Sequence, residues 1–163
     1  MPPERAARDL QVSSQVEPRW HPLLERLLFF NDQQHAVRAR VAAAIEQYGA
    51  LRIIEEGGSL RLRLERLADA QSLFCLLPDG RPVGCVVYSR DAADRFLVLH
   101  VAVEPAFSAR GQYSDGDVLL RMIGAVRAAA RRTRGVERVD LLYAAGRMRS
   151  LKVRPPTTGA PPP

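Results

Sequence analysis

The amino-acid sequence predicts an α+β (α/β) domain built on one central mixed, mostly antiparallel sheet, with N-terminal helices and one crossover helix. Three patterns predict this class. Two segments with helical periodicity come first, two β-hairpin patterns follow, and a strand, helix and strand pattern comes last. Hairpins give antiparallel pairs, whereas a strand, helix and strand in sequence give a parallel pair joined by a right-handed crossover.

The composition indicates a single globular domain. The chain has 163 residues, of which 47% are hydrophobic and 26% charged. Residues 1–19 show no sustained period and are predicted to form a flexible lead, residues 20–146 the domain, and the proline-rich residues 147–163 a disordered tail. No apolar run reaches the roughly 18 residues of a membrane helix, and no signal-peptide pattern opens the chain, so we expect a cytoplasmic protein that does not enter a membrane.

Two helices are predicted in the first third of the chain. The first runs from Pro22, a residue suited to the first helical position, to about Phe30, with Trp20 packing where it begins. The second runs from about Asp32, which can cap its N-terminus, to Tyr48, and Gly49 supplies a left-handed stop.

Two hairpins follow these helices. Apolar and charged residues alternate with period two over residues 51–56 and 59–66, on either side of Gly57 and Gly58. The first hairpin should therefore have one solvent-exposed face, which carries arginines. The second hairpin joins residues 73–77 and 83–89 through a Pro-Asp-Gly turn.

The two cysteines lie on the adjacent strands of the second hairpin. Cys75 and Cys85 are expected to be buried small hydrophobic residues rather than a disulfide. They lack metal-ligand spacing, and the chain has only 3 histidines, so no metal site is predicted.

The strand at residues 96–103 is the most apolar in the chain. Its apolar residues fill both faces, so it should be central and covered on both sides. His100 interrupts it, either as a satisfied core residue or as a cleft residue that could take a proton. Glu104, at the strand end, has the better location for a general base, although it could equally be an ordinary carboxylate.

A crossover helix and a last strand follow. The helix is predicted from about Asp117, a plausible N-cap, to Arg134, with Gly135 as its stop. Residues 136–143 form the last strand, parallel to the central one. A strand, a loop and a helix N-terminus in this order place backbone N–H groups and the positive end of a helix dipole together, so the loop between residues 105 and 117 could hold an anion such as phosphate.

The same stretch resembles the GNAT superfamily of acyl-CoA-dependent N-acyltransferases. In that superfamily a V-x-V-x-P strand leads into a Q/R-x-x-G-x-G/A loop and a leucine-rich helical turn. The matching residues here are Val101, Val103, Pro105, Arg110, Gly111, Val118, Leu119 and Leu120. The sequence is divergent, with Ser108 and Tyr113 at two motif positions, and incomplete, because few residues follow Tyr143 for the helix and two strands that would complete such a domain.

The resemblance implies a fold and an activity. It implies a GNAT-like domain that moves an acyl group from acetyl-CoA, or another acyl-CoA, to an amine of a small molecule or a protein. The backbone of Val101 and Val103 would hold the pantetheine arm. The pyrophosphate would meet the loop residues Arg110, Gly111, Gln112 and Tyr113. Glu104 or His100 would deprotonate the amine. The usual general acid of the superfamily is a tyrosine on the helix that is missing here, and Tyr143, at a strand end, is the candidate for that role.

A second class of function stays open from the sequence. The chain could be a catalytically inactive interaction or regulatory module that forms a homodimer through an open sheet edge at residues 136–143. The net charge of +6, carried almost wholly by arginine, could favour an anionic partner, but composition bias explains it as well. Nucleic-acid binding is not expected, since aromatic residues make up only 6% of the chain and no binding motif is present.

Overall fold

A computed structural model describes residues 9–30, 38–113, 117–142 and 149–153. The main sheet has six strands in the order β1-β4-β5-β6-β7-β8, and β2 and β3 form a separate two-stranded sheet. The main-sheet strands are β1 (Gln11–Ser13), β4 (Gln71–Leu76), β5 (Pro82–Ala92), β6 (Arg95–Val103), β7 (Arg138–Leu141) and β8 (Arg149–Lys152). The remaining elements are β2 (Leu51–Glu56), β3 (Ser59–Leu64), η1 (Pro18–Trp20), α2 (His21–Phe29), α3 (Arg38–Tyr48), η3 (Pro105–Phe107) and α4 (Val118–Arg132).

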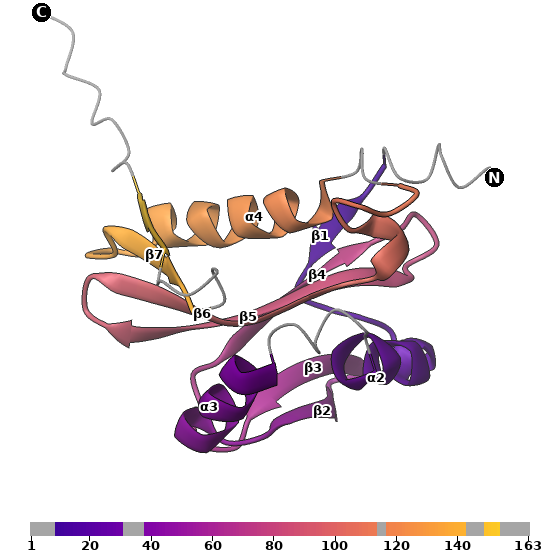
Figure 1. Cartoon of the computed structure of the whole chain (residues 1–163), viewed down its shortest axis with the longest axis horizontal. Coiled ribbons are helices and arrows are strands. Elements are labelled where there is room, and N and C mark those ends of the chain that lie inside the picture. The colour runs from indigo at the N-terminus through magenta and orange to yellow at the C-terminus, as the bar shows by residue number, and fades with distance from the viewer. Residues whose placement is uncertain (1–8, 31–37, 114–116, 143–148, 154–163) are drawn as a thin grey trace, which may run out of the picture.

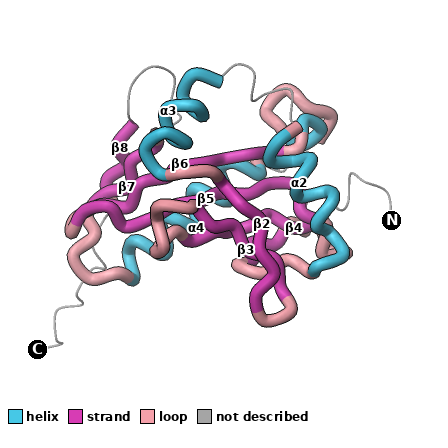
Figure 2. Tube along the Cα trace, turned by 90° about the horizontal axis from the view of Figure 1, so that it is seen from below, coloured by secondary structure: helices cyan, strands magenta, loops and turns pink. Residues whose placement is uncertain are grey.

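The elements stack in three layers (Figure 1). Helix α4 covers one face of the main sheet, and α2, α3 and the β2–β3 hairpin lie on the other face. Figure 2, seen from that second side, shows these elements lying across the strands. Among the described strands β6–β7 is the parallel pair and the other pairs are antiparallel, which confirms the predicted mixed, mostly antiparallel fold class.

The two faces of the main sheet carry separate apolar cores. The core on the α4 side includes Val86, Val98, Val118, Met122, Val126 and Val139. The core on the α2 side includes Leu24, Leu28, Leu60, Leu62, Phe74 and Val87. Strand β6 lies between β5 and β7 with residues 96–100 buried, so the prediction that this strand is central and covered on both sides is confirmed.

The ends of the helices agree only in part with prediction. Gly49 and Gly135 adopt φ of +82° and +85°, the left-handed conformation that favours glycine after a helix. Asp117 directly precedes α4, but its own φ is +43° and its side chain makes no capping hydrogen bond. The predicted Asp117 cap is therefore wrong, although the helix begins where expected. Asp32 lies outside the described residues.

The predicted flexible lead is wrong over residues 11–19. Strand β1 pairs with β4, with Val12 opposite Cys75, and the buried Val16 accepts a hydrogen bond from the Leu60 N–H at 2.7 Å. A strand of three residues spans less than two side-chain alternations, so periodicity cannot reveal it.

The predicted tail is wrong over residues 149–153. Strand β8 pairs antiparallel with β7, and Val153 beyond it is buried. The outer edge of β7 is therefore paired with β8, and the prediction of an open sheet edge at residues 136–143 is wrong. The proposed homodimer through that edge loses its structural basis. Four residues were too few for a strand pattern to stand out beside the prolines.

The cysteines behave as predicted. Both are free and buried, and they face opposite sides of the sheet, Cys75 toward the α4 core and Cys85 toward the α2 core. Burial raises the pKa of Cys75 to about 11 and that of Cys85 to about 12, so both thiols stay protonated and unreactive at neutral pH.

Two glycine-to-alanine substitutions should have opposite effects on stability. A Cβ at Gly84 would come within 2.6 Å of the Val118 side chain and 3.1 Å of Met122, whereas one at Gly124, exposed on α4, would meet nothing within 4 Å. Gly84→Ala should lower the free energy of unfolding by about 1–3 kcal/mol. Gly124→Ala, the matched control, should raise it by about 0.5–1 kcal/mol. Urea denaturation of both variants measures the difference, and an equal effect of the two would contradict the close packing at Gly84.

Candidate functional site

The central strand extends beyond its parallel neighbour. The β6–β7 pairing runs from Arg95 opposite Arg138 to Val98 opposite Leu141, and the Leu142 N–H still donates to the Val98 carbonyl at 3.2 Å. Beyond this point β6 continues to Val103 beside β5, and no described strand pairs with its other side.

A β-bulge lies where the parallel pairing ends. Val87 is opposite His100 and Tyr88 is opposite Val98, so Leu99 is an extra residue on β6. A bulge bends its strand and increases the local twist. The bend therefore coincides with the point at which β6 and β7 part.

The backbone direction at Val101 and Val103 follows from one hydrogen bond. The Glu104 N–H donates to the Val83 carbonyl on β5 at 2.8 Å. Because successive residues of a strand turn their N–H and C=O groups to opposite sides, Ala102 also faces β5, and Val101 and Val103 face away from it. The backbone of Val101 thus faces the side on which β7 has diverged.

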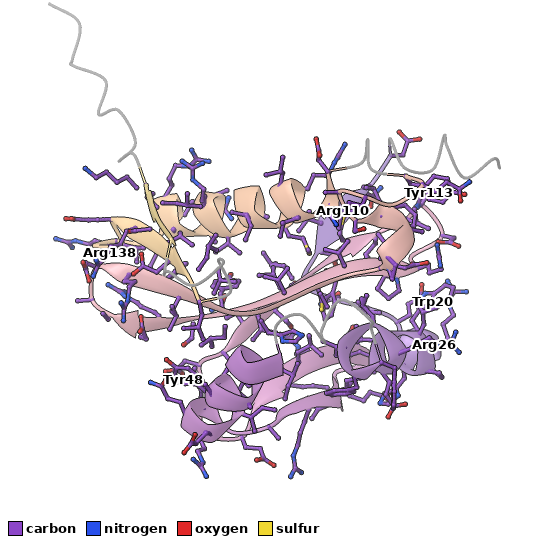
Figure 3. The ribbon with its side chains drawn as sticks, in the orientation of Figure 1. Trp20, Arg26, Tyr48, Arg110, Tyr113 and Arg138 are labelled. Atoms are coloured by element: carbon purple, nitrogen blue, oxygen red, sulfur yellow. The ribbon has the colours of Figure 1, made fainter. Side chains whose placement is uncertain are left out.

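Glu104 follows β6 directly and lines a small cavity. Its half-buried carboxylate pairs with the Arg81 guanidinium at 3.3 Å, and that guanidinium also lies 6.0 Å from the centre of the Phe107 ring. The cavity has a volume of about 270 Å³ and is walled by Leu23, Arg26, Leu27, Phe30, Arg81, Pro82, Glu104 and Pro105. Figure 3 labels Arg26, on α2 at the same end of the molecule as the loop that follows Glu104.

His100 lies in a different cavity. It is buried, and burial lowers its pKa to about 4, so the imidazole is neutral at physiological pH. The apolar cavity that it lines, of about 120 Å³, also involves Tyr48, Leu51 and Leu99. Four residues along a strand separate it from Glu104 by roughly 13 Å, so the structure does not bring the two predicted bases together. The burial of His100 fits the core residue of the two alternatives, and Glu104 lines a separate cavity at the end of the strand.

In the loop after Glu104, backbone N–H groups donate hydrogen bonds to carbonyls of the same loop. The Gly111 N–H donates to the Ser108 carbonyl at 2.8 Å, and the Tyr113 N–H donates to the Ala106 carbonyl at 2.7 Å. The Tyr113 ring packs on Phe107 with centroids 5.1 Å apart. In this structure both of these N–H donors therefore already have acceptors within the loop.

Gly111 has a structural reason to be glycine. A Cβ there would lie 2.3 Å from the Pro105 carbonyl oxygen and 2.4 Å from that of Ala106. The close approach that glycine permits is thus an approach of the loop to its own backbone. Arg110 and Gln112, on either side of Gly111, are exposed. Tyr143 lies outside the described residues.

Sequence reasoning missed Arg81 and Arg26. Arg81 belongs to the turn before β5, and only the fold places it beside Glu104, 23 positions away along the chain. Arg26 lies on the solvent-exposed face of an amphipathic helix, and no local sequence pattern distinguishes it from the other arginines. The sequence signal that pointed near them was the position of Glu104 at a strand end.

A larger cavity lies away from all of these residues. It has a volume of about 740 Å³, and residues of β3, β4 and β5 line much of it. Its arginines are engaged by the protein: Arg61 and Arg63 pair with Glu56 at 3.4 and 3.1 Å, and Arg90 donates to the Arg134 carbonyl at 3.1 Å. Each of these three guanidinium groups therefore already has a partner within the protein.

Comparisons with known proteins give structural similarity alone. No family model and no curated protein matches the sequence. The chain is similar to nourseothricin acetyltransferase, with a TM-score of 0.36 and 17% identity over 86% of this chain and 68% of that chain. It is also similar to a GNAT family acetyltransferase from Brucella melitensis in complex with acetyl-CoA, with a TM-score of 0.43 and 16% identity over 91% of this chain and 90% of that chain. Because both TM-scores lie below 0.5, the proposals below rest on the chain's own residues.

Two further findings concern the described residues alone. They contain no group of three or more His, Cys, Asp or Glu side chains placed to hold a metal ion. None of their helices is long and apolar enough to cross a membrane.

Proposed function

We propose that this protein is a divergent GNAT-like acyltransferase that moves an acyl group from acyl-CoA to an amine. The observation that carries the proposal is the part of β6 beyond Val98, where the backbone of Val101 faces away from β5 and no described strand lies beside it. That strand ends at Glu104, whose carboxylate lines a cavity large enough for a small acceptor. The two features supply a place for a thioester arm and a base for an amine.

Each residue has a limited role in this proposal. Acyl-CoA supplies the activated acyl group. The backbone of Val101 binds the pantetheine arm as an added strand would bind. The exposed Arg110 and Gln112 side chains contact the phosphates, in place of the internally bonded N–H groups of Gly111 and Tyr113. Glu104 takes a proton from the amine, directly or through one water, and β6 holds that carboxylate at its end.

Val101→Pro tests the backbone contact. Proline removes the N–H that faces away from β5 and leaves the ladder with β5 intact, so binding of acetyl-CoA should weaken about tenfold, as expected for one lost hydrogen bond. Val101→Ala is the matched control, because it shortens the side chain and keeps the N–H. Calorimetry with acetyl-CoA gives the Kd, and a thermal melt checks that both variants fold. Equal affinities of the two variants would contradict the role of this N–H.

A second candidate function has its own observation. Tyr113 packs on Phe107, and the N–H groups of Gly111 and Tyr113 are satisfied within the loop, as expected for a catalytically inactive interaction or regulatory module that keeps the fold without the cofactor loop. Acetyl-CoA distinguishes the two functions, since a ligand that binds the native state must raise its melting temperature. No heat of binding and no shift in melting temperature at millimolar acetyl-CoA would favour the inactive module and exclude the acyltransferase function.

A further inference from the structure

The cavity beside Glu104 combines an apolar wall with two cations. Leu23, Leu27 and Phe30 line it from one side, and Pro82 and Pro105 from the other. Its charged members are Arg26, Arg81 and Glu104. With a volume of about 270 Å³ it lies just below the roughly 300–1,000 Å³ of sites for drug-sized ligands, so it suits a small molecule.

The charges in this cavity do not balance. Arg81 is paired with Glu104, the one carboxylate among the lining residues, at 3.3 Å. Within the described part of the chain, the Arg26 guanidinium makes no ion pair and no side-chain hydrogen bond, and Arg26 is exposed on α2. An exposed guanidinium beside an apolar wall offers a site for a planar anion such as a carboxylate, which arginine binds through two parallel hydrogen bonds.

We infer that the acceptor is a small amine that also bears a carboxylate and an apolar side chain, as a free aliphatic α-amino acid does, and this inference rests on the proposed function. Arg26 binds the carboxylate, and the apolar wall receives the side chain. The amino group lies toward Glu104, which follows β6 and lines the cavity opposite the residues of α2.

The transfer step balances with these groups. Glu104 accepts one proton from the ammonium group, which leaves a lone pair on nitrogen. The N–C bond to the acyl carbon forms as the C–S bond of the thioester breaks, and the CoA thiolate leaves with the bonding electron pair. The second proton lost by nitrogen neutralises the thiolate, so the products are the N-acyl amino acid, CoA and one proton on Glu104.

Three related amines test the inference. Leucine, leucine amide and 3-methylbutylamine share the aliphatic side chain, but the second has an uncharged amide for the carboxylate and the third lacks the group altogether. With acetyl-CoA, we expect kcat/KM for leucine to exceed that for the other two by about ten- to a hundredfold, the range of a charge-assisted contact. The release of CoA thiol measures each rate.

Arg26→Gln locates that preference. The variant should lose about ten- to a hundredfold in kcat/KM for leucine, mainly through KM, and keep its rate with 3-methylbutylamine. Arg19→Gln is the matched control, since Arg19, which lies on η1, pairs with Glu17 and does not line the cavity. It should act on all three amines as the unchanged protein does.

The outcomes separate the inference from the proposed function. Transfer to all three amines at similar rates, or an equal loss with every amine in Arg26→Gln, overturns the inference and leaves the acyltransferase proposal standing. Absence of transfer to every amine, together with absence of acetyl-CoA binding by calorimetry, overturns both.

Discussion

Replacing Glu104 with glutamine is expected to lower kcat for acyl transfer by about a hundredfold or more, with the Kd for acetyl-CoA unchanged. Glutamine keeps the size of the side chain and its hydrogen-bonding reach but cannot take a proton at neutral pH. Loss of a positioned general base costs on the order of 10² to 10⁴ in rate. The expected split, a lower kcat with the same binding, follows because Glu104 sits at the strand end, whereas the backbone proposed to bind CoA precedes it.

The control for this prediction is Glu25→Gln. Glu25 is exposed on α2 and does not line the cavity. Its substitution therefore removes one carboxylate from a helix beside the cavity without changing the cavity itself. Single-turnover measurements at saturating acetyl-CoA and calorimetry provide kcat and Kd separately. A Glu104→Gln variant that turns over at the unchanged rate would show that another group takes the proton.

Arg81 sets a condition on that result. Its guanidinium pairs with Glu104 at 3.3 Å and must remain beside a neutral glutamine in the variant. Both side chains are only partly buried, about 28% exposed for Arg81 and 31% for Glu104, so water can solvate the arginine that loses its partner. We therefore expect a change of less than about 1 kcal/mol in the free energy of unfolding, small beside the effect on kcat.

Local patterns were sufficient for the elements that carry most of the fold. The turn at Gly57 and Gly58 places both residues at positive φ, and the buried Leu60 and Leu62 alternate with the less buried Arg61 and Arg63, as period two predicts. The sequence could not predict that this hairpin forms a sheet of its own. That choice depends on how its apolar face packs against α2 and β4, which are contacts between segments far apart along the chain.

The candidate site was predicted less completely than the fold. The GNAT resemblance pointed to the backbone of Val101 and Val103, but only the hydrogen bond from Glu104 to Val83 reveals which side of β6 that backbone faces. The role of Gly111 was misread, since a glycine that permits close approach does not reveal which group approaches, and here it is the Pro105 carbonyl. Arg81 could not be anticipated either, because the pairing of β5 with β6 is what brings it to Glu104.

His100 should make stability depend on pH between about 4 and 6.5. Burial lowers its pKa from 6.5 to about 4 in the folded state, whereas the unfolded chain keeps the ordinary value. Well above pH 6.5 both states hold the neutral imidazole and this contribution is constant. As the pH falls toward 4 the unfolded state binds a proton that the folded state does not, so the unfolded state gains stability.

The expected loss from this one residue is about 3 kcal/mol of unfolding free energy between pH 7 and pH 4. His100→Met isolates it, because methionine fills the same apolar surroundings and cannot titrate. Tyr48 is the other titratable residue lining the His100 cavity, and a tyrosine does not change protonation in this range. Urea denaturation at several pH values should give a shallower decline for His100→Met than for the unchanged protein, with carboxylates contributing equally to both. Parallel curves would mean that the imidazole is protonated in the folded state at pH 5, and would return His100 to the set of residues that can exchange a proton with a substrate.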